Sequence, residues 1–280
     1  MSKKSVITVT FGDAGENHVG NQQIGKKVNE GDGFTLQDFL LVKRNVELNY
    51  PSAEVTIYNM KDLLIDNIGE KNTTETIRQD MLDYLPDTCL IVIENLIPEE
   101  LANATEAELS CLDWDRKYWD TRRQKVLNKR ARKNLLFGRS DQEPDYENGK
   151  GRIVSFEKLP NLSEAKTIIS DVFGEKGQDL IGEGNGYDDR TKNGIGYHGD
   201  SERLKVIALR LNEMDEDGDR GTMPICFQWY YRSKRIGKKF TKNIGHGVVY
   251  GMTEYSTGYN WKYRSLYTIR HAAGGNKYTK

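Results

Sequence analysis

The chain of 280 residues is poor in several features that common functions require. Its cysteines are Cys89, Cys111 and Cys226, and without any Cys-x-x-Cys spacing they indicate reduced, partly buried thiols in a cytosol-like compartment. No apolar run reaches the roughly 18–20 residues that span a membrane, and the apolar part of the N-terminus is too short for a signal peptide. We therefore expect no membrane partner, no secretion, and a cytoplasmic location, or a nuclear one if the source is eukaryotic.

An excess of charge of either sign is also missing. Lysine and arginine together number 41 and aspartate and glutamate 42, so the net charge of −1 gives no overall basic field to indicate a nucleic-acid partner. Histidine is scarce, with only His18, His198, His246 and His271. The length suits one large domain, or one domain with an appended segment.

The most informative stretch runs from Asn185 to Arg203 and reads as two extended pieces joined by a polar, glycine-rich turn. His198 and Asp200 are two residues apart, so on a strand both side chains point to one face. An imidazole and a carboxylate placed in this way supply two of the three ligands in the facial triad of non-heme iron oxygenases. The alternative is a β-hairpin whose polar side chains only face solvent.

This stretch resembles the AlkB family of iron(II)/2-oxoglutarate dioxygenases, especially its nucleic-acid repair members. The resemblance rests on Asn185-x-Tyr187, a turn, and then Gly-x-His198-x-Asp200-x-Glu-Arg. It implies that Asn185 and Tyr187 contact 2-oxoglutarate and that His198 and Asp200 bind Fe(II). It also implies that Glu202 and Arg203 face the substrate.

The C-terminal part resembles the family less closely. Arg264-x-x-x-Thr268-x-Arg270 is similar to the family's Arg-x-Asn-x-Thr-x-Arg, with Leu266 in place of Asn, and the resemblance implies that these residues hold 2-oxoglutarate. Spacing of two would place all three on one face of a strand. Two arginines can bind the two carboxylates of this co-substrate in bidentate fashion.

The third metal ligand departs from the family pattern. The aromatic-rich turn where the family has its second histidine, residues 257–263, contains none. His271 is our first choice, although it would face away from Arg270 on an ideal strand unless a bulge turns it inward. His246 and a site with only two protein ligands remain alternatives, as does a site that no longer binds iron.

Two basic segments are candidates for contacts with DNA or RNA. Residues 122–133 carry seven basic side chains, and residues 232–239 form a second cluster that we expect at a hairpin turn. The alternative for each is a solvated charged surface. Tyr146 lies in a segment similar to the family's substrate lid, where an aromatic ring could stack on a flipped-out base.

The expected fold is α+β and mainly β, with a double-stranded β-helix (jelly-roll) core, flanking helices and an N-terminal extension. We expect residues 1–85 to form the extension, of unknown role, and residues 86–280 to form the dioxygenase domain. Alternation of apolar residues and helical spacing predict both strands and helices. Strands are expected at 5–11, 55–58, 89–94, 205–211, 225–231, from 240, 248–252 and 265–273, and helices at 74–85, from 98 to about 114, and at 163–173.

The function that follows from the resemblance is oxidative removal or hydroxylation of N-alkyl groups on nucleobases, with Fe(II) and 2-oxoglutarate as cofactors. Two alternatives remain open at this stage. One is an oxygenase of the same type acting on a protein, a small molecule or an unmodified base. The other is a non-catalytic binding module with a degenerate metal site.

Overall fold

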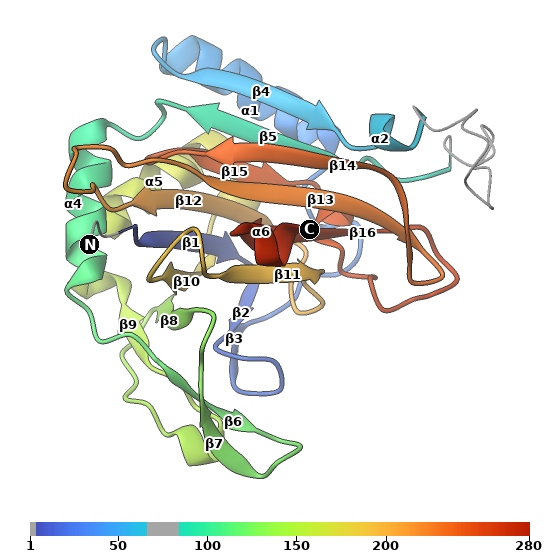
Figure 1. Ribbon diagram of the computed structural model, residues 1–280. Helices are drawn as coiled ribbons and strands as arrows, with labels where there is room; N and C mark the ends of the chain where they lie inside the picture. Colours follow the sequence, from blue (N-terminus) through green and yellow to red (C-terminus); the bar gives the residue numbers. More distant parts are fainter. Residues whose placement is uncertain (1–3, 66–83) are drawn as a thin grey trace.

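The protein is described by a computed structural model that covers residues 4–65 and 84–280. It is mixed α+β and mainly β, with two facing sheets and helices on the outer side of the larger one (Figure 1). The large sheet has, in spatial order, β4 (Glu54–Asn59), β5 (Cys89–Glu94), β15 (Val249–Met252), β12 (Val206–Asn212), β1 (Val6–Gly12), β10 (Ile181–Tyr187), β8 (Lys133–Gly138) and β9 (Ile153–Ser155). Neighbours in it are antiparallel except β8 and β9, which are parallel.

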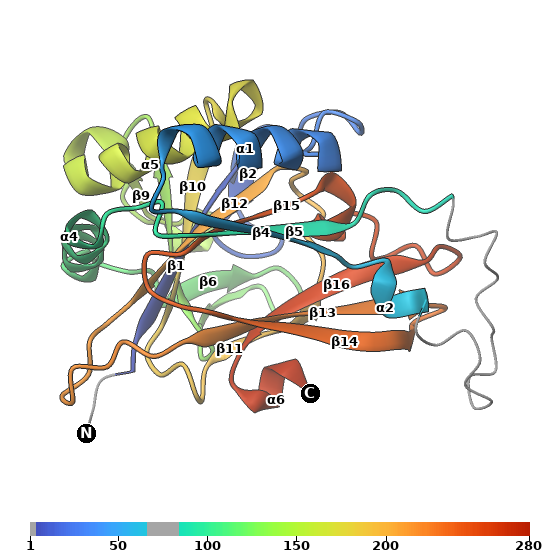
Figure 2. The ribbon, with the colours of Figure 1, turned by 90° about the horizontal axis from the view of Figure 1, so that it is seen from above.

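The small sheet packs against the other face of the large one, and Figure 2 shows the two sheets as layers. Its antiparallel strands, in spatial order, are β11 (Gly194–His198), β16 (Thr268–Gly274), β13 (Met223–Tyr231) and β14 (Lys234–Ile244). Two separate ribbons are β2 (Ala14–Glu16) with β3 (Gln23–Gly25) and β6 (Lys117–Asp120) with β7 (Lys125–Asn128). The β6–β7 ribbon projects from the body of the molecule (Figure 1).

Helices lie mostly on the outer face of the large sheet (Figure 2). They are α1 (Leu36–Asn49), α2 (Asp62–Ile65), α4 (Glu99–Ser110), α5 (Pro160–Phe173) and α6 (Asn276–Thr279), with 3-10 turns η1 (Tyr146–Asn148), η2 (Phe156–Lys158), η3 (Glu175–Gly177) and η4 (Glu254–Thr257). α1 begins with a capping box, because the Thr35 hydroxyl accepts the Asp38 backbone N–H and the Asp38 carboxylate accepts the Thr35 N–H. In the described ranges, none of these helices is both long and apolar enough to traverse a lipid bilayer.

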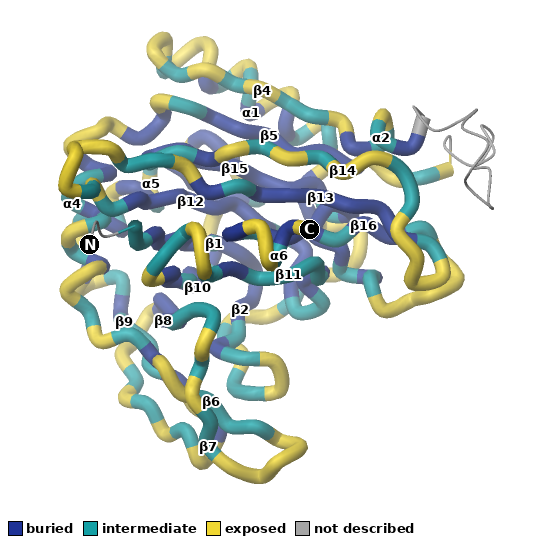
Figure 3. Tube along the Cα trace, in the orientation of Figure 1, coloured by how far each residue is buried: buried dark blue, intermediate teal, exposed yellow. Residues whose placement is uncertain are grey.

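Alternation along the strands divides the core into two layers. Odd-numbered residues of β1, such as Val9, pack with α1 and α5, as does Leu209 of β12. Ala208 of β12 instead packs between the sheets with Phe227 and Trp229 of β13. Figure 3 shows buried residues concentrated in the central strands and exposed ones in the loops and the β6–β7 ribbon. This alternation determines whether a side chain of the large sheet points toward the helices or toward the small sheet.

The strands expected from the sequence are present, and β5 has the predicted bounds. One expectation was wrong: β14 begins at Lys234, so only Arg232 and Ser233 form the hairpin turn that we expected to extend to residue 239. Strong pairing with β13 extends the strand through the basic residues. The expected helix at 74–85 lies almost entirely outside the described residues.

Residues 4–65 contribute two strands, β1 and β4, to the large sheet. β1 is hydrogen-bonded between β12 and β10, and β4 pairs with β5. The boundary expected between residues 85 and 86 therefore falls between two paired strands of one sheet. This position of β1 brings a side chain of the N-terminal segment, Thr8, opposite Asn185 and Arg210.

Candidate metal centre

The hairpin expected at residues 185–203 connects the two sheets, because β10 belongs to the large sheet and β11 to the small one. Its turn is held by side chains: Asn193 Oδ1 accepts the Asp189 N–H at 3.0 Å, and Asp189 Oδ1 accepts the Thr191 N–H at 2.9 Å. β11 contains an irregularity between Ile195 and His198. Three residue steps on β11 there match two on β16, as in a β-bulge, and this register places His198 directly opposite His271.

His198, Asp200 and His271 form a group that could hold a metal ion, since their ligand atoms lie within 4.8 Å of one another. Asp200 Oδ1 is 3.6 Å from His198 Nε2 and 3.5 Å from His271 Nε2. Two ligands about 2.1 Å from one ion and at right angles to each other lie ~3 Å apart, so a small closing movement would complete a site. Figure 1 shows β11 and β16 as neighbours at the edge of the small sheet.

The backbone around the group fixes the orientation of its members. His198 Nδ1 donates to the Gly196 carbonyl at 2.8 Å, since a carbonyl can only accept, and this leaves Nε2 free to bind a metal. The Asp200 N–H donates to the Thr257 carbonyl at 2.9 Å. Between them, Gly199 has no room for a side chain, because a Cβ there would lie 2.0 Å from the Gly258 carbonyl oxygen.

The surroundings of the group favour the protonation states that metal ligands require. Burial, with a smaller contribution from His271, lowers the pKa of His198 to about 3. Burial alone would raise the pKa of Asp200, but Arg203 and the two imidazoles outweigh it and hold that pKa well below its usual range. A neutral imidazole and an ionised carboxylate are the forms that bind metals.

Arg203 is buried against three carboxylates. Its Nε lies 3.5 Å from Asp200 Oδ2, and its Nη2 donates to Glu202 Oε1 at 2.8 Å and also to Glu183 of β10. Burial raises the pKa of Glu202 even though Arg203 opposes this shift. Arg203 therefore links the group of His198, Asp200 and His271 to the large sheet, and its expected contact with the substrate stays a prediction.

The expected co-substrate residues of β10 lie on the side of the large sheet that faces the small sheet. Asn185 is half-buried, accepts Asn134 Nδ2 at 2.5 Å and donates to Glu183 Oε1 at 3.1 Å. Tyr187 is buried and packs with Val6 and with Met223 of β13. Burial raises the pKa of Tyr187, against the charges of Arg132 and Arg210.

Of the C-terminal residues expected to hold 2-oxoglutarate, Thr268 and Arg270 lie on β16 and Arg264 lies apart from them. Arg264 is exposed in the turn before β16, where its Nε donates to Ser233 Oγ at 3.1 Å, so the expectation that it shares a strand face with Thr268 and Arg270 was wrong. Arg270 packs over the rings of Tyr230 at 4.1 Å and Trp261 at 5.0 Å. The reason for the error is that β16 begins only at Thr268.

Arg270 and His271 occupy opposite faces of β16, as an ideal strand requires. His271 points toward Phe227, with ring centroids 6.1 Å apart, and toward His198, at 4.4 Å. No bulge in β16 is needed to bring His271 into the group, because the irregularity lies in β11. His246 does not join the group, and its Nδ1 accepts the Asn212 N–H at 3.0 Å.

Some side chains of the two basic segments make contacts within the protein, and others are exposed. In the first, Arg122, Arg123 and Lys125 are exposed on the β6–β7 ribbon, but Lys129 Nζ donates to the Asn17 carbonyl at 2.9 Å, and burial lowers the pKa of Lys129 to about 7. In the second, Arg235 stacks over Tyr197 at 4.9 Å. In the expected substrate lid, the Tyr146 hydroxyl donates a hydrogen bond to Asp115 Oδ1 at 2.7 Å.

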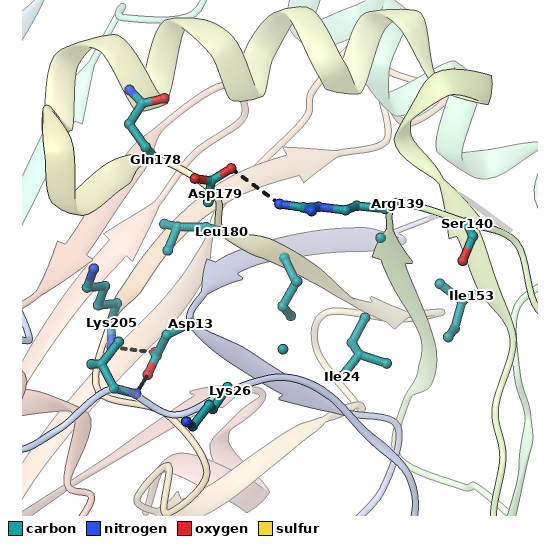
Figure 4. Close-up of a pocket in the computed structure, with 14 residues that line it drawn as sticks. Asp13, Ile24, Lys26, Arg139, Ser140, Ile153, Gln178, Asp179, Leu180 and Lys205 are labelled. Carbon is teal, nitrogen blue, oxygen red and sulfur yellow. Dashed lines mark hydrogen bonds and ion pairs between the residues drawn. The ribbon is translucent and has the colours of Figure 1, made fainter.

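Figure 4 shows a pocket of about 500 Å³ that lies apart from the group of His198, Asp200 and His271. Arg139 and Asp179 form an ion pair of 3.6 Å at this pocket, and both side chains are exposed. Asp13 accepts the backbone N–H groups of Val28 and Lys205, each at 2.8 Å, so its carboxylate ties loops together. None of the site residues expected from the sequence lines this pocket.

One buried charge near the expected site was missed. Arg210 stands in β12 with its side chain on the same face as Ala208, between the sheets. The signal was present in the sequence, because a single arginine interrupts the otherwise apolar Val206–Leu211. The pattern of apolar residues along a strand does not explain a single buried arginine. Only the register of β12 against its neighbouring strands shows which residues surround Arg210.

Comparison with known proteins gives one informative relative. No family model matches the chain. The uncharacterized protein R156 of Acanthamoeba polyphaga mimivirus is 33% identical over 287 residues, an alignment that covers 99% of this chain and 98% of the mimivirus protein. The chain therefore belongs to the same family as this mimivirus protein.

Proposed function

We propose that this chain is an AlkB-like iron(II)- and 2-oxoglutarate-dependent dioxygenase that hydroxylates or demethylates N-alkylated nucleobases in DNA or RNA. The observation that carries the proposal is the His198, Asp200 and His271 group, two imidazoles and one carboxylate brought together by β11 and β16. This is the ligand set of the facial triad, which leaves coordination positions open for oxygen and a co-substrate.

The donor atoms fit such an ion. Both imidazole Nε2 atoms lie beside the same carboxylate oxygen, and His198 is oriented by the hydrogen bond of its Nδ1. His271 Nδ1 is buried without a hydrogen-bond partner in the described chain, so the polar interactions of this ring are those of its Nε2 beside Asp200. Bound iron would supply the oxidising chemistry, and the residues around it would determine orientation and access.

The winding of the chain supports a jelly-roll core. From β10 onward the strands fall in the large, small, large, small, small, large and small sheet, which is the back-and-forth course of a jelly roll. An eighth strand is needed between β10 and β12, and β1 occupies that place. With β1 included, the proposed jelly roll draws on both ends of the chain.

The surrounding residues would have distinct roles in the reaction. Arg203 holds Asp200 and Glu183 in place, so we assign it positioning rather than substrate contact. Asn185 and Tyr187 face the small sheet and are candidates for contacts with 2-oxoglutarate. Glu202, with its raised pKa, would accept or donate a hydrogen bond at the edge of the substrate.

The charged segments bear on the class of substrate. The exposed Arg122, Arg123 and Lys125 on the projecting ribbon favour a phosphate-bearing target. The internal contacts of Lys129 and Arg235 favour a second candidate, an oxygenase of the same type that acts on a protein or a small molecule. Succinate formation with and without methylated oligonucleotides separates the two, because only the first candidate predicts stimulation by nucleic acid.

Metal binding provides the direct test. We expect wild-type protein to bind one Fe(II), or Mn(II) as a stable substitute, and the variants His198→Ala and His271→Ala to lose affinity by at least about tenfold to a hundredfold, as loss of even an outer partner of a ligand does. His246→Ala is the matched control, since it removes an imidazole outside the group. Equal metal affinity in all four proteins would rule out the proposal.

A further inference from the structure

Arg210 is a buried cation without a counter-ion. It is 0% exposed, and its closest polar side-chain contact is the Tyr250 hydroxyl, 3.5 Å from Nη2. Its Nε and Nη1 have no hydrogen-bond partner, and in the described part of the chain no carboxylate forms an ion pair with it. A buried charge is strongly unfavourable unless it is paired and hydrogen-bonded. The Arg210 guanidinium therefore requires an anionic partner, and the described residues do not provide one.

Arg210 ends a row of polar side chains that crosses four strands. The cross-strand partners are Asn134 of β8 with Asn185 of β10, Asn185 with Thr8 of β1, and Thr8 with Arg210 of β12. Thr8 is also buried, and its hydroxyl has no hydrogen-bond partner. The row faces the small sheet, because the adjacent positions on β1 and β12 pack against the helices.

Asn185, an inner member of this row, connects it to the group of His198, Asp200 and His271. Asn185 donates to Glu183, Glu183 pairs with Arg203, and Arg203 Nε lies 3.5 Å from Asp200 Oδ2. The ligand triad and the polar row therefore belong to one region between the two sheets. Arg210 is two strands from β10, about 10 Å at the usual strand spacing, so it marks the side of the region remote from Glu183.

We infer that Arg210 binds the distal carboxylate of the 2-oxo acid co-substrate, with the hydroxyls of Thr8 and Tyr250 as additional partners. The inference rests on the proposed function and replaces the expected contribution of Arg264 and Arg270. A carboxylate neutralises the guanidinium and can accept N–H groups of Nη1 and Nη2 at its end, or of Nε and Nη2 along its side, in the fork geometry that arginine favours. The keto-acid end of the same molecule then points toward the metal-binding group.

The test measures binding of the full-length protein without added metal, by calorimetry with glutarate. Glutarate has both carboxylates but no keto group, so its binding reports the anchor separately from metal chelation. We expect Arg210→Met to weaken glutarate binding by about tenfold to a hundredfold, the loss of hydrogen bonds to a charged group. The matched variant Arg270→Met should bind glutarate as wild type does, because Arg270 faces away from the group.

A second measurement excludes a merely structural effect. Without ligand, Arg210→Met should unfold at the wild-type temperature or above it, since an unpaired buried charge has been removed. At a glutarate concentration that saturates wild type, the unfolding temperature should rise clearly for wild type and much less for the variant. If Arg210→Met does not fold, Thr8→Val and Arg210→Lys decide by the same titration, and wild-type affinity in both would overturn the inference.

Two further outcomes are decisive. Loss of glutarate binding in Arg270→Met but not in Arg210→Met would overturn the assignment. Unchanged Mn(II) affinity in Arg210→Met, together with weakened glutarate binding, would support it. If wild type does not bind metal, the proposed function is wrong. The glutarate titration, which needs no metal, would still test whether Arg210 binds a dicarboxylate.

Discussion

Arg203 and Arg210 are two buried guanidinium groups on the same side of the large sheet, and they differ in their partners. Arg203 is 4% exposed and contacts the carboxylates of Asp200, Glu183 and Glu202. Arg210 is 0% exposed and has only a hydroxyl nearby. A buried charge with its counter-ions built into the fold has its desolvation compensated, whereas one without them does not, and this difference supports the inference that Arg210 binds an anion from outside.

The largest effect is expected for Arg203→Met. It leaves three carboxylates near one another without their cation, and breaking a buried ion pair costs about 3–5 kcal/mol. Urea unfolding measures the free energy of unfolding. Arg116→Met is the control, because the ion pair of Arg116 with Asp188 is exposed and is worth only about 0–1 kcal/mol. Equal losses in the two variants would contradict the structural role of Arg203.

A carboxylate placed beside Arg210 should make it resemble Arg203. Thr8→Asp puts an acid directly across from the unpaired Arg210, and we expect it to raise the free energy of unfolding by about 1.5–3 kcal/mol, the net contribution of hydrogen bonds to charged groups, and to prevent glutarate binding. Thr10→Asp is the control on the same face of β1, but opposite Glu183. Like-charge repulsion should make that variant less stable. A destabilised Thr8→Asp protein would mean that Arg210 already has a counter-ion.

The smallest effect concerns Glu16, an acid beside the Arg203 cluster. Burial, with repulsion from Glu202 and Glu183, raises the pKa of Glu16 from 4.5 to about 7. The neutral acid therefore contributes stability that is complete below pH 4.5 and is lost as the pH rises through 7.

Glu16→Gln removes this dependence. Its unfolding temperature relative to wild type should increase between pH 5 and pH 8, as differential scanning calorimetry at both pH values would measure. If the difference in unfolding temperature between Glu16→Gln and wild type were the same at both pH values, the pKa of Glu16 would not be raised. Arg203 would then keep Glu16 ionised together with its three carboxylate partners.

The sequence predicted the elements whose signal is local. β1 and β5 were recognisable from β-branched and apolar residues, and α5 from its helical spacing. The spacing of His198 and Asp200 likewise placed both in one short segment, where the structure finds them beside each other. The start of β14 was missed because pairing with β13, not the composition of the basic segment, extends that strand.

The face of His271 could not be read from its own strand. Alternation correctly separates it from Arg270, but whether it or Arg270 meets His198 depends on the register of β16 against β11 and β13. A register shift of one residue would exchange the two faces. The basic segments pose the same problem, since the sequence cannot show that Lys129 is anchored to Asn17.

The sequence by itself determined the local pattern: a mainly β chain, with an imidazole and a carboxylate two residues apart in one short segment. Only the tertiary structure decided that His271 completes this pair, that β1 lies between β10 and β12, and that Arg210 is buried without a counter-ion. The physical reason is that cross-strand pairing joins residues more than 70 positions apart, as His198 with His271 and Thr8 with Arg210. Periodicity within one strand contains no information about its neighbours.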